Sequence, residues 1–235
     1  MPPSARPRLV LFDIDGTLVM SGRIGSRAVK RAFHEVFGVE DATTGVLFDG
    51  KTDPGILREL LELHGLGHRH CDDTRAAFFQ RYLEVLADER ACAETGHVHP
   101  GIHELLAALE ACEDVTVGLL TGNIREGARI KLERFSLWAR FPFGAFGDDA
   151  ETRDELVPIA LTRAHDFRRI RFAPADTYVI GDSLRDIQCA RAGGAVAVAV
   201  ATGGTPIAEL AARRPDALFP DLSDTARVLE ALGVG

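Results

Sequence analysis

Apolar residues along this chain recur with two different spacings. Residues 9–12 form a fully apolar run, which predicts a strand buried on both faces. After residue 97, short apolar runs alternate with segments of helical spacing. Repeated units of this kind predict an α/β fold with a Rossmann-like, doubly wound parallel sheet. The later strands are expected at residues 115–120, 144–146, 177–181, 195–200 and 217–219.

The segment between about residues 20 and 97 has helical spacing and no convincing strand. A first helix with one apolar stripe ends at Gly38. A second begins with Asp53 as its N-cap and Pro54 at the first helical position, and a third begins near Asp72. The segment is therefore expected to be an all-helical insertion after the first strand.

The expected domain boundaries follow from this change of spacing. Residues 1–19 and 98–235 are assigned to the Rossmann-like core, and residues 20–97 to the inserted helical domain. A chain of 235 residues is long enough for a core domain with one smaller insertion.

Composition limits the possible partners and compartments. Hydrophobic residues make up 46% and charged residues 26%, as in an ordinary globular protein. The net charge of −8 provides no basic field for nucleic acid or an anionic membrane, so an anion must be captured locally. No apolar run is long enough to span a bilayer, and the four scattered cysteines favour reduced thiols. We expect a cytoplasmic protein, monomeric or homodimeric.

The predicted strands end in residues that carry chemistry. Ligands of doubly wound sheets bind beyond the carboxyl ends of the strands. The residues at these ends are Asp13 and Asp15, then Thr121, Gly122 and Asn123, and then Asp182, with Asp186 one turn later. Four carboxylates at one pole repel each other, and a hard divalent cation such as Mg²⁺ is the simplest compensation.

The segment 121–123 offers a phosphate site at the same pole. The amides of Gly122 and Asn123 stand at a helix N-terminus and can act with the Thr121 hydroxyl. Taken alone, each aspartate is more simply a turn or helix cap, and Thr121 is equally an N-cap. Together they favour a site in which a carboxylate attacks phosphorus. The loop 201–205 is interpreted as a plain loop and is left out of the site.

Three segments resemble motifs of the haloacid dehalogenase superfamily, in its phosphatases with a helical cap after the first strand. They are DIDGT (13–17), LLTGN (119–123) and GDSLRDI (181–187). The resemblance implies that Asp13 is the nucleophile, that Asp15 is the general acid and base, and that Thr121 binds a phosphate oxygen. It further implies that Mg²⁺ is held by Asp13, Asp182 and the backbone carbonyl of Asp15. Asp186 would either coordinate the cation directly or contact the groups that do.

One position departs from the family pattern. The third motif is usually a lysine ahead of GDSLRDI, but no lysine lies between Lys131 and Asp182. Arg153 is the best candidate for the catalytic and phosphate-binding cation, because arginine stays charged although its fork differs from an ammonium. A solvated charge at a helix end is the alternative for Arg153. Lys131, in the middle of a predicted helix, is the weaker choice.

The insertion resembles the family's cap, which closes over substrate and excludes water. Lys51, Thr52 and Asp53 are candidate specificity residues in a cap loop. A polar turn in which Asp53 caps a helix is an equally simple interpretation.

The resemblance implies a Mg²⁺-dependent phosphatase acting on a small phosphorylated metabolite through an aspartyl-phosphate on Asp13. By cap placement the chain resembles phosphoglycolate phosphatases and β-phosphoglucomutase-like proteins. A sugar-phosphate mutase on the same scaffold is the nearest alternative. A catalytically weak protein that binds a phosphometabolite for regulation is the other, and Arg153 in place of lysine is the feature that favours it. Dehalogenation needs neither Asp15 nor a metal and is disfavoured.

Overall fold

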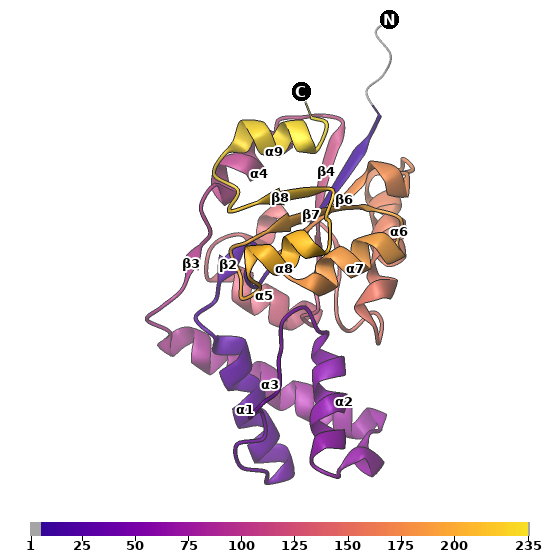
Figure 1. The fold of residues 1–235 in the computed structure, drawn as a ribbon. Helices are drawn as coiled ribbons and strands as arrows, with labels where there is room; N and C mark the ends of the chain where they lie inside the picture. Colours follow the sequence, from indigo (N-terminus) through magenta and orange to yellow (C-terminus); the bar gives the residue numbers. More distant parts are fainter. Residues whose placement is uncertain (1–5, 235) are drawn as a thin grey trace, which may run out of the picture.

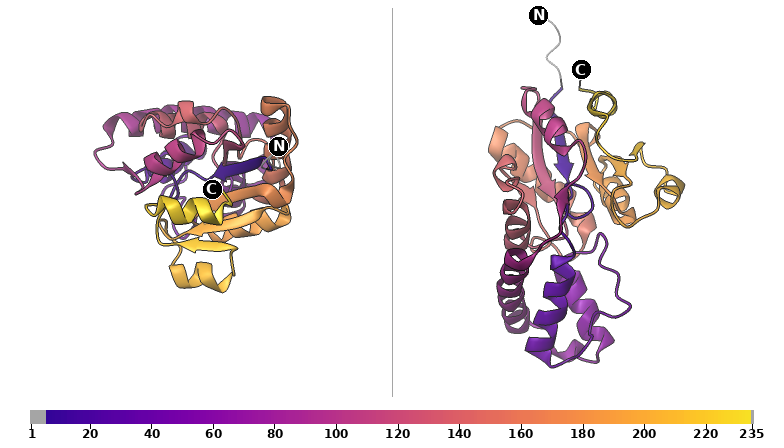
Figure 2. Two further views of the ribbon diagram at one scale, coloured as in Figure 1. Left: turned by 90° about the horizontal axis from the view of Figure 1, so that it is seen from above. Right: turned by 90° about the vertical axis from the view of Figure 1, so that its left-hand side faces the viewer.

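The computed structural model describes residues 6–234 of the chain. Residues 1–5 of the expected core segment, and residue 235, lie outside this described part. The chain forms a six-stranded sheet with helices on both faces, and a group of helices lies beyond one end of the sheet (Figures 1 and 2). The expected α/β, Rossmann-like fold class is confirmed.

The sheet is parallel throughout and has the strand order β5-β4-β1-β6-β7-β8. Because β1 lies between β4 and β6, the residues that follow these three strands are neighbours in space. The strands are β1 (Arg8–Phe12), β4 (Val115–Leu120), β5 (Gly144–Ala145), β6 (Thr177–Gly181), β7 (Val196–Val200) and β8 (Ala217–Phe219).

Each face of the sheet buries alternate residues of β1. Val10 and Phe12 pack in one hydrophobic cluster with α4, α5 and α9, and Leu9 and Leu11 in another with α6, α7 and α8. All four side chains are 0% exposed, which contributes about 1.5–3 kcal/mol for each. The helices are α4 (Ile102–Glu110), α5 (Arg125–Glu133), α6 (Leu156–Arg168), α7 (Leu184–Ala192), α8 (Ile207–Ala212) and α9 (Thr225–Ala231). Short 3-10 turns, η2 to η4, cover Trp138–Arg140, Arg153–Glu155 and Pro174–Asp176.

The inserted segment consists of α1 (Ile24–Phe37), α2 (Asp53–Leu63), the 3-10 turn η1 (Gly67–Arg69) and α3 (Asp72–Cys92). These helices, called the cap below, share a core of their own around Phe33, Leu57 and Tyr82. Ile124 and Ile130, next to and within α5, belong to the same core, so the cap packs firmly on the sheet domain. As expected, α1 ends at Gly38, whose φ of 73° is in the left-handed region.

Helix α2 begins differently from the expectation. Its N-cap is Thr52, whose hydroxyl accepts a hydrogen bond from the Gly55 amide at 3.1 Å. Asp53, expected to be the N-cap, is the first helical residue and its carboxylate points elsewhere. The expectation was wrong because both residue types cap helices, and the local sequence does not show that a tertiary partner takes the aspartate.

Two short strands connect the cap to the core. β2 (Val19–Met20) and β3 (His97–Val98) pair antiparallel, at the two boundaries expected for the insertion. The domain boundaries themselves remain a prediction from the sequence.

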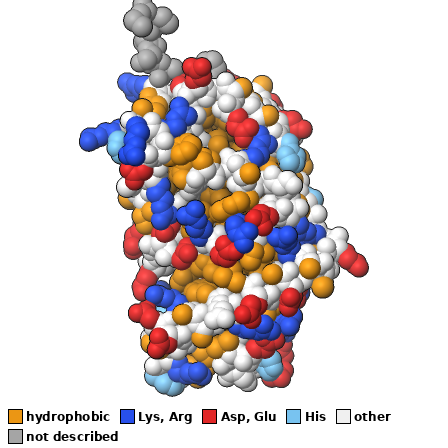
Figure 3. Space-filling view, turned by 180° about the vertical axis from the view of Figure 1, so that it is seen from behind, with side chains coloured by type: hydrophobic (Ala, Val, Ile, Leu, Met, Phe, Trp, Pro, Cys, Tyr) orange, Lys and Arg blue, Asp and Glu red, His pale blue; other side chains and the backbone are white. Residues whose placement is uncertain are grey.

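The face of the molecule behind the view of Figure 1 carries interspersed basic and acidic side chains with apolar patches between them (Figure 3). On this face, no charge of one sign gathers into a broad field. Within residues 6–234, no helix is both long enough and apolar enough to cross a membrane.

Candidate active site

The carboxyl ends of β1, β4 and β6 open into one cavity of about 380 Å³ between the sheet and the cap. Asp13, Asp15, Thr121 and Asp182 line it from the core, as the strand-end argument requires. The cap contributes apolar side chains, including Val29, Ile56 and Tyr82. The core side of the cavity is thus polar, and the cap side carries both polar and apolar side chains.

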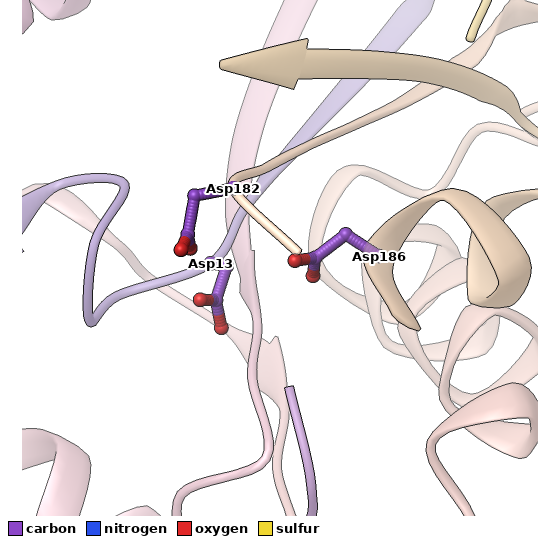
Figure 4. A group of neighbouring side chains, drawn as sticks. All are labelled: Asp13, Asp182 and Asp186. Atoms are coloured by element: carbon purple, nitrogen blue, oxygen red, sulfur yellow. The ribbon is translucent and has the colours of Figure 1, made fainter. Parts of the chain in front are cut away.

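Three carboxylates converge at the core side of this cavity (Figure 4). Asp13 follows β1, Asp182 follows β6 and Asp186 lies in the first turn of α7, and one oxygen from each lies within 4.8 Å of the others. Burial, with Asp186 nearby and despite Arg153, raises the pKa of Asp13 to about 6. Burial and the charges of Asp186 and Asp13 raise the pKa of Asp182 well above its ordinary value.

The donor set of this cluster fits Mg²⁺. Hard divalent cations prefer several carboxylate and carbonyl oxygens, and three buried carboxylates meet here. Both Asp186 oxygens already accept hydrogen bonds, from Arg153 and from the amide and hydroxyl of Ser183. Asp182 accepts a bond from Thr17 on only one oxygen, at 3.1 Å. Asp13 and Asp182 are therefore better placed to bind a cation directly than Asp186.

Arg153 lies in the 3-10 turn η3 and is buried, with 6% of its surface exposed. Its Nη2 donates to Asp13 Oδ1 at 2.8 Å and to Asp186, and its Nη1 donates to the backbone carbonyl of Gly50 in the cap at 3.2 Å. The two carboxylates outweigh burial and hold the pKa of this guanidinium above its usual range. The arginine fork therefore reaches the nucleophile candidate and the cap together, which excludes a purely solvated role for it.

The loop after β4 presents its groups to the cavity at close quarters. A Cβ on Gly122 would lie 2.0 Å from the Lys51 carbonyl of the cap, so no larger residue fits this approach. The Asn123 amide points back to Thr121 Oγ1 at 3.3 Å. Of the two amides expected to bind phosphate, that of Gly122 is the one with no hydrogen bond in the described structure.

The Asp15 carboxylate bonds to residues outside the aspartate cluster. Ser21 Oγ donates to its Oδ1 at 2.7 Å, and Asn123 Nδ2 donates to its Oδ2 at 3.0 Å. Lys131 Nζ donates both to Asp15 Oδ2 and to Asn123 Oδ1. Although burial would raise it, the charge and hydrogen bond of Lys131 lower the pKa of Asp15.

Lys131 is the polar side chain that sequence reasoning undervalued. It lies on the buried side of α5, next to Ala128, Ile130 and Leu132, and 5% of its surface is exposed. A signal was available, because a chain with only three lysines places one of them in the apolar stripe of a helix.

The cap loop before α2 contacts the core directly. The Asp53 amide donates to the Gly122 carbonyl at 2.7 Å, and Asp53 Oδ2 accepts from the Ile124 amide at 2.8 Å. Burial raises the pKa of Asp53 to about 6, although Lys131 and the Ile124 amide oppose the shift. Of the three specificity candidates, Lys51 and Asp53 line the cavity, and Lys51 pairs with Glu59.

Thr52, the remaining candidate, is buried but lies outside the cavity lining. Besides capping α2, its hydroxyl donates to the Glu151 carbonyl at 3.2 Å. The structure thus places Thr52 in the seam between cap and core, beside the cavity and not in its lining.

The loop after β7 belongs to the cavity, contrary to its interpretation as a plain loop. Gly203 and Gly204 line the cavity, and Thr202 Oγ1 donates to the Gly16 carbonyl at 2.6 Å. A Cβ on Gly203 would lie 1.7 Å from Asp182 Oδ2, so this loop packs against a carboxylate of the cluster. A sequence signal for this role was available, because the loop follows β7, the strand next to β6, at the same edge of the sheet.

Comparisons with known proteins agree with this architecture. The model of the haloacid dehalogenase-like hydrolase family matches residues 10–191. A phosphoglycolate phosphatase of Pseudomonas savastanoi pv. phaseolicola is 32% identical over 214 residues, covering 86% of this chain and 74% of that protein. A phosphoglycolate phosphatase of Escherichia coli is 26% identical over 250 residues, covering 97% and 93%.

Solved structures show the same fold. A hydrolase from Pseudomonas syringae superposes with a TM-score of 0.71 at 22% identity and covers 96% of this chain and 98% of its own. The β-phosphoglucomutase of Clostridium difficile superposes with a TM-score of 0.70 at 15% identity, covering 97% and 98%.

Proposed function

Because this chain belongs to the haloacid dehalogenase-like hydrolase family and is a phosphatase of that family, we propose that it hydrolyses a small phosphorylated metabolite in a Mg²⁺-dependent reaction through an aspartyl-phosphate on Asp13. The observation that carries the proposal is the position of Asp13. Its carboxylate is buried, pairs with Arg153 at 2.8 Å and lines the same cavity as Thr121 and Gly122.

In the first half-reaction an Asp13 oxygen attacks phosphorus, and the bond from phosphorus to the leaving oxygen breaks. Thr121 Oγ1, the Gly122 amide and Arg153 bind the phosphoryl oxygens and stabilise the charge that develops on them. Asp13, Asp182 and the Asp15 carbonyl would hold Mg²⁺, with Asp186 orienting Arg153 and the loop. When bound, the cation neutralises the repulsion between Asp13 and the phosphate.

Asp15 acts on the other side of the phosphoryl group. In its protonated form this carboxyl gives a proton to the leaving oxygen, and the carboxylate, which the charge of Lys131 favours, then takes a proton from the water that hydrolyses the aspartyl-phosphate. This second step frees phosphate, restores Asp13 and returns to Asp15 the proton for the next turnover. The cap loop 50–53 closes the cavity from above, because it bonds to Gly122, Ile124 and Arg153 in the core. These bonds hold the loop over the reacting groups and reduce their contact with bulk water.

The cavity supports a small substrate. Its volume of about 380 Å³ suits a metabolite of a few carbons, and Lys51 reaches it from the cap. Relatives at 26% and 32% identity are named phosphoglycolate phosphatases, so phosphoglycolate is the first compound to test.

The test is phosphate release from a panel of phosphorylated metabolites that includes phosphoglycolate and hexose phosphates, with and without Mg²⁺. We expect metal-dependent release that Asp13→Asn reduces by at least about 10⁴-fold. Asp166→Asn removes an exposed carboxylate of α6 and should retain full activity. No release by the folded wild-type protein with Mg²⁺ present would contradict the proposal, and isomerised products without net phosphate release would indicate a mutase.

A further inference from the structure

Lys131 is a buried ammonium whose place is not explained by packing alone. Its side chain is 6% exposed on the face of α5 that otherwise buries apolar residues. Burial of an ammonium is strongly unfavourable unless its partners compensate. The partners here are Asp15 and Asn123, both of which line the active-site cavity.

The bonds of Lys131 fix the orientation of the Asn123 amide. Because Nζ donates to Asn123 Oδ1, the Nδ2 group must face the other way. There it donates to Asp15 Oδ2 at 3.0 Å and to Thr121 Oγ1 at 2.9 Å. Lys131 therefore controls Asp15 twice, by its own bond and through Asn123.

A substrate-binding role for Lys131 is less consistent with its surroundings. The carboxylates of Asp15 and Asp53 both act on its charge, so little positive field is left for an anionic group. Gly25 of α1 lies against Nζ, since a Cβ there would be 3.0 Å from that atom. Lys131 lines the cavity, but its hydrogen bonds and the contact at Gly25 come from protein groups.

We propose that Lys131 is a positioning residue for Asp15, holding this carboxyl in the place from which it serves the leaving oxygen. The inference rests on the proposed function, in which the Asp15 proton goes to the leaving oxygen as the bond to phosphorus breaks. Lys131 does not contact the phosphoryl group. Its removal therefore affects substrates in proportion to their need for that proton.

The test compares two leaving groups through kcat/KM, which reports the transfer to Asp13. An alkyl phosphate, the best one in the panel above, needs a proton on its leaving oxygen, whereas 4-nitrophenyl phosphate releases a stable phenolate. In Lys131→Met and Lys131→Gln, kcat/KM for the alkyl phosphate should fall about 10- to 100-fold through kcat, and that for 4-nitrophenyl phosphate by less than about 3-fold. Two variants are used so that misfolding of one leaves the other.

Two controls separate positioning from general damage. Lys30→Met removes an exposed lysine paired with Asp41 and should leave both substrates unaffected. On an Asp15→Asn background, Lys131→Met should cause no further loss, because the group on which it acts is gone.

The inference is overturned if both substrates lose equally, if the loss adds to that of Asp15→Asn, or if only KM for anionic alkyl phosphates rises, which would make Lys131 a substrate ligand. Wild-type protein that is inactive on every substrate overturns the proposed function as well. Wild-type activity with a uniform Lys131 effect overturns this inference alone.

Discussion

Two buried cations, Arg153 and Lys131, line the cavity, and their surroundings differ. Arg153 meets the cluster of Asp13, Asp182 and Asp186, where three carboxylates surround one guanidinium. Lys131 pairs with Asp15, the neutral Asn123 accepts its second hydrogen bond, and the charge of Asp53 also acts on it. The Arg153 side has three carboxylates for one cation and the Lys131 side has two, so the excess of negative charge is larger on the Arg153 side. The comparison teaches that the Arg153 side, where three carboxylates converge, is the side whose charge favours a further cation.

The geometry of each cation matches its surroundings. The planar fork of Arg153 spans two carboxylates and the Gly50 carbonyl of the cap, which a single ammonium cannot do. Lys131 is a point charge that joins two adjacent side chains, Asp15 and Asn123. Arg153 therefore links the Asp13 carboxylate to the cap.

The largest effect should come from removal of the metal, which would leave the carboxylates on the Arg153 side without their added cation. Chelation should abolish phosphate release, and added Mg²⁺ should restore it. At about 100 times its Kd, Mg²⁺ should stabilise wild-type protein by about 3 kcal/mol in thermal unfolding. Asp182→Asn should lose most of this gain, because it removes a ligand from the cluster, whereas Lys131→Met should keep it. An equal Mg²⁺ shift in Asp182→Asn and wild type would disprove the assignment of the cluster.

A smaller effect should follow from substitution of Arg153, including its replacement by lysine, the residue type of the other buried cation. Arg153→Met should lower kcat by about 10²- to 10³-fold, because a charge at the phosphoryl oxygens is lost. Arg153→Lys keeps the charge but cannot also reach the Gly50 carbonyl, so we expect a loss of roughly 10-fold. Initial rates with the best substrate measure both. If lysine were no better than methionine, the charge would not be what matters at this position.

Much of this arrangement was accessible from the sequence because it depends on strand ends. Asp13, Thr121 and Asp182 each follow a strand directly, so the parallel order β4-β1-β6 was enough to bring them together. Arg153 was identified by its position ahead of the last motif, and the structure places it against Asp13.

What the sequence could not provide are contacts that no local pattern encodes. The bond from the Ile124 amide to Asp53 spans 71 positions, and that from Lys131 to Asp15 spans 116. Helix signals near Asp53 describe only where α2 begins, and the mid-helix place of Lys131 says nothing about what lies across the cavity. The first bond depends on how the cap packs on the core, and the second on how α5 packs beside the end of β1, and both are tertiary packing.

The smallest effect concerns stability on the Lys131 side, at Asp53. Burial raises its pKa from 3.8 to about 6, so the folded state holds this proton more tightly than the unfolded state. Its contribution to stability is full below about pH 4 and is lost as pH rises through about 6. Asparagine does not ionise, so Asp53→Asn does not lose stability in this way as pH rises. The unfolding free energy of the variant relative to wild type should therefore rise by about 2 kcal/mol between about pH 4 and 7.5.

Urea unfolding at these two pH values measures that difference. The matched control is a carboxylate whose pKa is shifted in the opposite direction. The hydrogen bond and charge of Lys30 lower the pKa of the exposed Asp41, so its contribution is present at neutral pH and lost in acid. The difference between Asp41→Asn and wild type should thus run the other way with pH. If this free-energy difference changed with pH in the same direction for Asp53→Asn and Asp41→Asn, burial would not control the pKa of Asp53. The contact between the cap and the Ile124 amide would then have to be explained by hydrogen bonding alone, without a change in the charge of Asp53.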